Sequence, residues 1–302
     1  MNGNTGNTIA AVSTRNLNNP AQGWINGFVG MLIFSGSLPA TRVAVLEFDP
    51  IFLTAIRATI AGFLAIGALL MIKQQLPQRH EILPLIFVAL GVVIGFPLLT
   101  AFALQHTTSA HSLVYIGLLP LATACFGVIR GGERPKPAFW LFSLLGSLCV
   151  GSFALSQGSG SSWLGDVLMI AAVLLCGLGY AEGAVLTRKL GGWQVISWAL
   201  AIALPLTTAV TVFSAPSIWP IVSRSAWIAL AYVSLFSMWL GFIFWYRGLA
   251  QGGIAAVGQL QLLQPFFGLA LAGLILHETV QLSMLAVMAG VLVCVFGAKK
   301  FS

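Results

Sequence analysis

The chain has 302 residues, of which 58% are hydrophobic and only 7% charged, with a mean hydropathy of +0.97. A soluble domain needs roughly 25% charged residues to cover its surface, so most of this surface must face lipid. One membrane span takes about 20 apolar residues, and about ten to twelve spans would use the whole chain. The composition therefore excludes a soluble enzyme, a DNA-binding domain and a disulfide scaffold.

The net charge of +7 does not indicate nucleic acid binding, because the basic residues lie singly between apolar runs and form no patch. Residues 1–22 are rich in Asn, Gly and Thr and lack the layout of a cleavable signal, so we expect a disordered cytoplasmic tail. The cysteines lie inside apolar runs without metal-ligand spacing, and we interpret them as small core residues. They are Cys125, Cys149, Cys176 and Cys294.

Splitting the apolar stretches at charges and turn residues predicts ten transmembrane helices, an all-α polytopic membrane protein. The expected spans of the first half cover residues 24–46, 50–72, 82–104, 107–129 and 137–156. Those of the second half cover residues 163–187, 193–214, 225–249, 253–276 and 280–297.

The Lys and Arg residues predict the orientation of these spans, because cytoplasmic loops are enriched in both. One side would carry eleven of the fourteen: Arg15, Lys73, Arg79, Arg130, Arg134, Lys136, Arg188, Lys189, Arg247, Lys299 and Lys300. The other side would carry Arg42 and Arg224, with Arg57 inside a span. We therefore expect a multi-pass protein of the inner (plasma) membrane with both termini in the cytoplasm.

The two halves of the chain indicate a duplication, because a shift of 145 residues pairs identical residues without a gap. The pairs are Leu104 with Leu249, Ala110 with Ala255, Pro120 with Pro265, Glu133 with Glu278, Cys149 with Cys294 and Val150 with Val295. Five spans per half is an odd number, so the second copy would be inverted in the membrane. The expected units are residues 23–157 and 163–302, joined by the Gly/Ser linker 158–162.

Each half resembles the EamA repeat of the drug/metabolite transporter superfamily. The first half carries Phe34, Ser35, Arg42, Ala110, Leu113, Pro120, Gly132, Glu133, Gly146 and Gly151. The second half repeats the later part as Ala255, Gly258, Pro265, Glu278, Gly290 and Gly297. Phe34 stands where Trp is common, and His277 where Gly is usual. The resemblance implies two inverted five-helix repeats around a central cavity that moves small organic solutes.

The charged and polar residues of the spans exclude several chemistries. No Gly-Lys pair exists, so the chain has no P-loop for ATP, and we expect no ATPase partner. His106 and His111 lie five residues apart with no nearby carboxylate, so we expect no metal and no cofactor. Ser35 and His111 could be arranged as in an intramembrane protease, but G-x-S-x-G is missing, and we predict no enzyme.

Three buried charges remain as candidates for other roles. We interpret Asp166 and Glu182 as structural or charge-pairing residues, because neither falls at the middle of a span. Arg57 could guide an anionic group or pair with Asp49 or Glu47, and we favour the pairing.

The resulting hypothesis is a monomeric secondary transporter that exports small metabolites, most similar to the aromatic amino-acid exporters of the YddG type. A multidrug or nucleobase-type exporter on the same fold is the alternative, and a facilitator stays open. The resemblance places Phe34, Ser35, Phe96, Gly117, Tyr180 and Trp245 near the central cavity. We add Trp239, Gln259 and Gln261, because rings plus amides suit an amino acid with an apolar side chain. Pro120 and Pro265 are predicted to kink two helices and allow gating.

Overall fold

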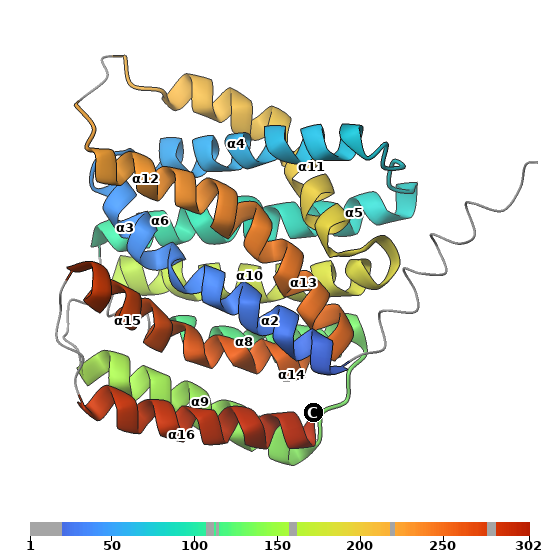
Figure 1. Ribbon diagram of the computed structural model, residues 1–302, viewed down its shortest axis with the longest axis vertical. Helices are drawn as coiled ribbons and strands as arrows, with labels where there is room; N and C mark the ends of the chain where they lie inside the picture. Colours follow the sequence, from blue (N-terminus) through green and yellow to red (C-terminus); the bar gives the residue numbers. More distant parts are fainter. Residues whose placement is uncertain (1–19, 107–111, 113–114, 157–161, 218–220, 277–281) are drawn as a thin grey trace, which may run out of the picture.

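The computed structural model describes residues 20–106, 112, 115–156, 162–217, 221–276 and 282–302, and its elements in these ranges are all helices. The helices lie side by side in one bundle, and α9 (Pro137–Ser156) packs along α16 (Leu282–Phe301) at one edge (Figure 1). Most of the predicted tail and of the Gly/Ser linker lies outside the described residues. So do Ala110, His111, Leu113, His277 and Glu278.

Some of the predicted spans form one continuous α-helix, whereas others change helix type or are interrupted along their length. The first half contains α2 (Pro20–Ser35), α3 (Ser37–Val45), α4 (Pro50–Met71), α5 (Arg79–Val88), the π-helix η1 (Ala89–Gly95), α6 (Phe96–His106), α8 (Leu119–Gly131) and α9. The second half contains α10 (Trp163–Leu190), α11 (Gly192–Ser214), α12 (Arg224–Tyr232), the π-helix η2 (Val233–Leu240), α13 (Gly241–Gly252), α14 (Ile254–Gly258), the 3₁₀-helix η3 (Gln259–Leu263), α15 (Gln264–Leu276) and α16. In the described part of the chain, six helical stretches are long and apolar enough to cross a membrane, and two shorter apolar helices accompany them. These helices make a multi-pass membrane protein, while the count of ten spans stays a prediction.

The helix boundaries repeat with the same shift of 145 residues that the sequence shows. The shift carries the first and last residues of α8 onto those of α15, and likewise those of α9 onto α16. It also carries the end of η1, at Gly95, onto the end of η2, at Leu240. The duplication therefore includes the points where helices change type.

Glycines allow close packing between helices of the two halves. A Cβ atom on Gly23 of α2 would lie 2.5 Å from the backbone N of Gly252, and one on Gly248 of α13 would lie 2.5 Å from that of Gly27. Since backbone atoms cannot move aside as a side chain can, α2 and α13 touch only because these positions have no Cβ.

A second glycine contact joins η1 to α10. A Cβ atom on Gly91 of η1 would come within 3.0 Å of the Cα of Gly179 in α10. Small residues therefore let these two helices pack closely as well.

Glu133 connects the two halves at one end of the bundle. Gly132 ends α8 in the left-handed conformation, at φ 66°, and the chain then turns so that the Glu133 carboxylate accepts hydrogen bonds of 2.7 Å each from the backbone N–H groups of Ile254 and Ala255. Arg188 lies 3.4 Å from the same carboxylate. The Gly132-Glu133 motif thus caps the start of α14.

Asp166 and Glu182, the two acidic residues inside predicted spans, also have partners. Glu182, buried in α10, pairs with Arg130 of α8, and the carboxylate of Asp166 interacts with the hydroxyl of Tyr115. Both acids therefore have partners of the kind that a structural or charge-pairing role requires, and the role itself stays a prediction.

One sequence interpretation needs correction. Cys125 is exposed, whereas Cys176 and Cys294 are buried and all four cysteines are free; in a bundle surrounded by lipid, a small apolar side chain can face outward. Pro120 is the second residue of α8, directly after the turn at residues 117 and 118, and Pro265 is the second residue of α15, directly after the 3₁₀-helix η3. Both prolines therefore lie where the helical path changes, and their role in gating stays a prediction.

Candidate functional site

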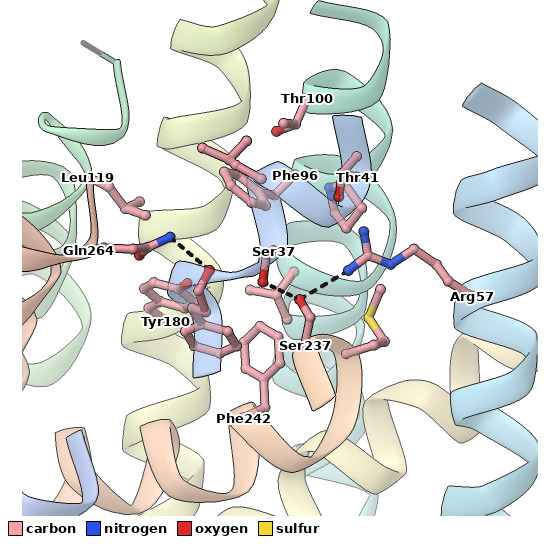
Figure 2. A pocket seen from close by; sticks show the side chains of 15 residues that line it. Ser37, Thr41, Arg57, Phe96, Thr100, Leu119, Tyr180, Ser237, Phe242 and Gln264 are labelled. Carbon is pink, nitrogen blue, oxygen red and sulfur yellow. Dashed lines mark hydrogen bonds between the residues drawn. The ribbon is translucent and has the colours of Figure 1, made fainter. Parts of the chain in front are cut away.

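A cavity lies inside the bundle among residues from both halves (Figure 2). Its water-accessible volume is about 50 Å³, enough for a few water molecules at roughly 10–15 Å³ each. Its lining consists of Phe34, Ser37, Leu38, Thr41, Arg57, Val92, Phe96, Pro97, Thr100, Leu119, Tyr180, Ser237, Met238, Phe242 and Gln264.

The cavity lies where several helices are interrupted. Phe34 and Ser37 flank Gly36, the turn residue between α2 and α3. Phe96 is the first residue after η1, and Ser237 lies within η2. Irregular backbone at membrane depth occurs where it lines a cavity or is buried in protein, and π-helical segments are common at functional sites. The interruptions therefore mark this region as the candidate site.

Three pairs of lining residues obey the 145-residue shift. They are Val92 with Ser237, Pro97 with Phe242, and Leu119 with Gln264. Equivalent positions of the two halves therefore face the same space, and the cavity lies between the halves.

One wall of the cavity is aromatic. The ring of Phe34 lies 4.9 Å from that of Phe242, and the ring of Tyr180 lies 6.0 Å from Phe242. Trp245 is fully buried behind them, 6.1 Å from Phe34 and 5.5 Å from Tyr180. These distances are those of favourable ring contacts, so the wall presents an apolar face held in place by its own packing.

The facing side is polar and carries a positive charge (Figure 2). The hydroxyl of Ser37 donates to Ser237 Oγ at 2.7 Å, and Arg57 Nη2 donates to the same oxygen at 3.2 Å. The hydroxyl of Thr100 is buried without a hydrogen-bond partner. Together these groups offer several donors to a ligand.

Gln264, the first residue of α15, forms part of the cavity wall. Its Nε2 donates to the backbone carbonyl of Phe34 at 3.3 Å. That carbonyl belongs to the last turn of α2, where the helix ends and its acceptors need partners from elsewhere.

The predicted pairing of Arg57 with Asp49 or Glu47 is wrong. Asp49 caps α4, accepting from the backbone N–H groups of Ile51 at 2.8 Å and Phe52 at 3.0 Å. Glu47 accepts from the hydroxyl of Ser223 at 2.5 Å and from its backbone N–H at 2.6 Å. These two hydrogen bonds lower the pKa of Glu47. Asp49 therefore caps the start of α4, and Glu47 binds Ser223, which caps the start of α12.

Three of the nine residues predicted for the site line the cavity: Phe34, Phe96 and Tyr180. Trp245 lies one layer behind them. The hydroxyl of Ser35 donates to the backbone carbonyl of Met31 at 2.9 Å, within its own helix. Gly117 is buried in the turn before α8 and is not part of the lining.

The remaining predicted residues lie away from the lining. The indole N–H of Trp239 donates to Ser197 at 2.9 Å, and Gln259 Nε2 donates to Ser143 at 3.1 Å. Gln261 is fully buried, and its amide makes no hydrogen bond, although the Tyr180 hydroxyl is nearby.

Twelve of the fifteen lining residues were not among the predicted site residues. They include Ser37, Thr41, Thr100, Ser237, Phe242 and Gln264. Short hydroxyl side chains are common in spans, so nothing in the sequence separates these from others. Gln264 had a usable signal, since it precedes Pro265 at a position equivalent to Leu119.

Comparison with known proteins gives the family. The model of the EamA-like transporter family matches twice, over residues 21–154 and 163–298. This chain belongs to the EamA-like transporter family. The drug/metabolite transporter assignment made from the sequence is thereby confirmed.

Relatives of this EamA-like transporter include the "Uncharacterized transporter YdeK" of Bacillus subtilis, 64% identical over 95% of this chain and 100% of the relative. An "Uncharacterized transporter" of Archaeoglobus fulgidus is 27% identical over 82% of this chain and 87% of its own length. A solved crystal structure matches with a TM-score of 0.77 at 20% identity, covering 94% of this chain and 100% of that one, which shows the fold. The family and its relatives make this protein a transporter.

Proposed function

We propose that the protein is a monomeric secondary transporter that exports small organic metabolites, foremost aromatic amino acids, across the inner membrane. In this proposal the two halves are inverted repeats with both chain ends in the cytoplasm, and they alternately open the cavity to each side. The sequence has no phosphate-binding loop, so an ion or solute gradient would drive transport.

The observation that carries the proposal is the cavity between the halves, with an aromatic wall facing a polar one. Binding sites for small molecules combine apolar surface with a few placed polar groups. At about 50 Å³ the cavity is smaller than an amino acid, so the halves must separate to admit one. Leu119 and Gln264 begin the helices that carry Pro120 and Pro265, and we propose these helix starts as the moving parts.

Transport by purified protein in liposomes tests the proposal. Vesicles loaded with unlabelled phenylalanine should accumulate external labelled phenylalanine by exchange, faster than threonine and faster than vesicles without protein. Uracil and a cationic dye are tested in parallel, with and without a pH gradient. Exchange of uracil or the dye without exchange of phenylalanine would replace the amino-acid assignment by the nucleobase or multidrug alternative.

A further inference from the structure

Arg57 is a buried cation in the cavity wall that no carboxylate in the described part of the chain neutralises. It lies in α4, about 10 Å from the start of that helix by the rise per residue, and its residue surface is only 6% exposed. Among the residues that the structure describes, no acidic group lies within ion-pair distance of it. The two acids nearest in sequence are engaged at the end of the bundle.

The partners that Arg57 does have are neutral and leave donors unused. Nη2 reaches the backbone carbonyl of Val233 at 3.4 Å and Ser237 Oγ at 3.2 Å. Nε has no partner, and no hydrogen bond uses Nη1. An arginine cannot lose its proton inside a protein, and a buried charge is costly unless it is paired. A fixed cation with free donors beside a cavity is thus suited to bind an anion reversibly.

The hydroxyl groups around Arg57 add donors to the same place. Ser237 Oγ accepts from both Ser37 and Arg57, so its own proton is free to point into the cavity. The hydroxyl of Thr100, which is 3% exposed, has no partner. A carboxylate accepts several such hydrogen bonds, and its planar shape matches the guanidinium fork.

The opposite wall defines the rest of the ligand. Tyr180 lies across the cavity from Arg57, with Phe242 next to it (Figure 2), and Phe34 also lines the cavity. None of the fifteen described lining residues is acidic. We propose that Arg57 binds the carboxylate of the transported substrate, so that the protein selects aromatic carboxylates and rejects cations and uncharged analogues. This inference rests on the proposed function only in calling the ligand a transported substrate, because binding of the carboxylate can be measured without transport.

Three probes that share one ring and one chain length test the head group. They are 3-phenylpropanoate, 3-phenylpropanamide and phenethylamine, each titrated against the purified full-length protein while tryptophan fluorescence and thermal unfolding are followed. The carboxylate should bind roughly tenfold to a hundredfold more tightly than the amide, the range of a charge-assisted hydrogen bond, and the amine should not bind.

Variants locate the preference at Arg57. Arg57→Met should abolish it, and Arg57→Lys should keep a weaker one, since lysine retains the charge without the fork. Ser237→Ala, which removes one partner of the guanidinium, should reduce it if Arg57→Met does not fold. Arg42→Met is the matched control, because Arg42 is partly buried and, like Arg57, donates to a backbone carbonyl, that of Leu104 at 2.7 Å, but does not line the cavity.

The inference is overturned if the carboxylate and the amide bind equally, if no probe binds, or if Arg57→Met keeps the preference. The transport assay separates this from the proposed function. Carboxylate binding that depends on Arg57, without any exchange of phenylalanine, would overturn the transport proposal alone. Exchange of phenylalanine that Arg57→Met leaves unchanged would overturn the inference alone.

Discussion

Phe96 tests the aromatic lining with a single change. It is the first residue of α6 and lines the cavity. Phe96→Ala should lower the exchange of phenylalanine roughly twofold to tenfold relative to threonine, because a ring contact of about 0.5–1.5 kcal/mol is available only to the aromatic substrate. The ratio of the two exchange rates in liposomes measures this.

Phe63→Ala is the control for that ratio. Phe63 lies in α4, the helix of Arg57, but is 59% exposed on the outside of the bundle. An unchanged ratio in Phe96→Ala, or an equal change in Phe63→Ala, would contradict the assignment of Phe96 to the substrate site.

The two partners of the ion pair between Arg130 and Glu182 differ in how exposed their side chains are. The Arg130 side chain is 44% exposed, whereas that of Glu182 is 4% exposed. Arg130→Met leaves a buried carboxylate without its partner and should cost about 3 kcal/mol or more. Glu182→Gln leaves a half-exposed cation that water can reach, and should cost about 1 kcal/mol.

Thermal unfolding of the two variants and of the double variant measures the difference. The double variant should be more stable than Arg130→Met, because it no longer buries an unpaired charge. Equal melting temperatures for the two single variants would show that burial of Glu182 does not decide the effect.

Arg57 shows the limit of inference from local sequence. Two acids, Asp49 and Glu47, precede it closely, so pairing was the simpler expectation. Asp49 instead binds the first turn of its own helix, and Glu47 binds Ser223, which is 176 residues away in the chain. The spacing of Asp49, Glu47 and Arg57 in the sequence reveals neither of these competing partners. By contrast, the family resemblance, which carries tertiary information, named Phe34, Phe96 and Tyr180, and all three line the cavity. Their contact with a substrate stays a prediction.

The packing of α2 on α13 depends on glycines, and Gly248 tests it. A Cβ at this position would lie 2.5 Å from the backbone N of Gly27 and 2.7 Å from its Cα. Gly248→Ala should therefore destabilise the protein by about 1–3 kcal/mol, as overpacking does. The matched control is Gly67→Ala in α4, where a Cβ meets nothing within 4 Å.

The control should change the free energy of unfolding in the opposite direction and by a smaller amount. Alanine is a better helix former than glycine by roughly 0.5–1 kcal/mol, so Gly67→Ala should raise the melting temperature while Gly248→Ala lowers it. If both variants melted at the wild-type temperature, the close approach of α2 and α13 would not be a source of stability.

Helix type was harder to predict than helix position. The expected spans begin and end close to the observed helices, as for α4 and α11, because charges and turn residues mark those ends. The π-helices η1 and η2 left no such mark. The sequence of η1 is apolar throughout and that of η2 is apolar except for Ser234 and Ser237, so hydrophobic periodicity cannot distinguish a π-turn from an α-turn. The cavity was therefore predicted as a feature of the family and located only by the structure.

At the level of the entire bundle, charges gather at one end. Lys136 donates its backbone N–H to Phe301 at 3.0 Å, which joins the start of α9 to the end of α16. The ammonium of Lys299 lies 4.4 Å from the ring centre of Trp24, near the start of α2. The positive-inside rule assigned both Lys136 and Lys299 to the cytoplasmic side, and these two lysines lie at the same end of the bundle.

Cysteine labelling in intact cells tests which way this end faces. In a background without the four native cysteines, Lys136→Cys and Lys299→Cys should be protected from an external, membrane-impermeant thiol reagent, because basic residues are retained in the cytoplasm. Glu47→Cys and Arg224→Cys, near the contact between the start of α4 and the start of α12, should react. Gly160→Cys in the linker is expected to react as well.

Two other labelling patterns would contradict different parts of the proposal. Reaction at Lys136→Cys and Lys299→Cys, with protection at Glu47→Cys and Arg224→Cys, would reverse the orientation but keep the bundle. Protection of Gly160→Cys together with Lys136→Cys would contradict an odd number of spans in the first half, and with it the inverted repeat. Since alternating access in the proposed form requires the two halves to be inverted copies, that single result would also remove the structural basis of the proposed transport cycle.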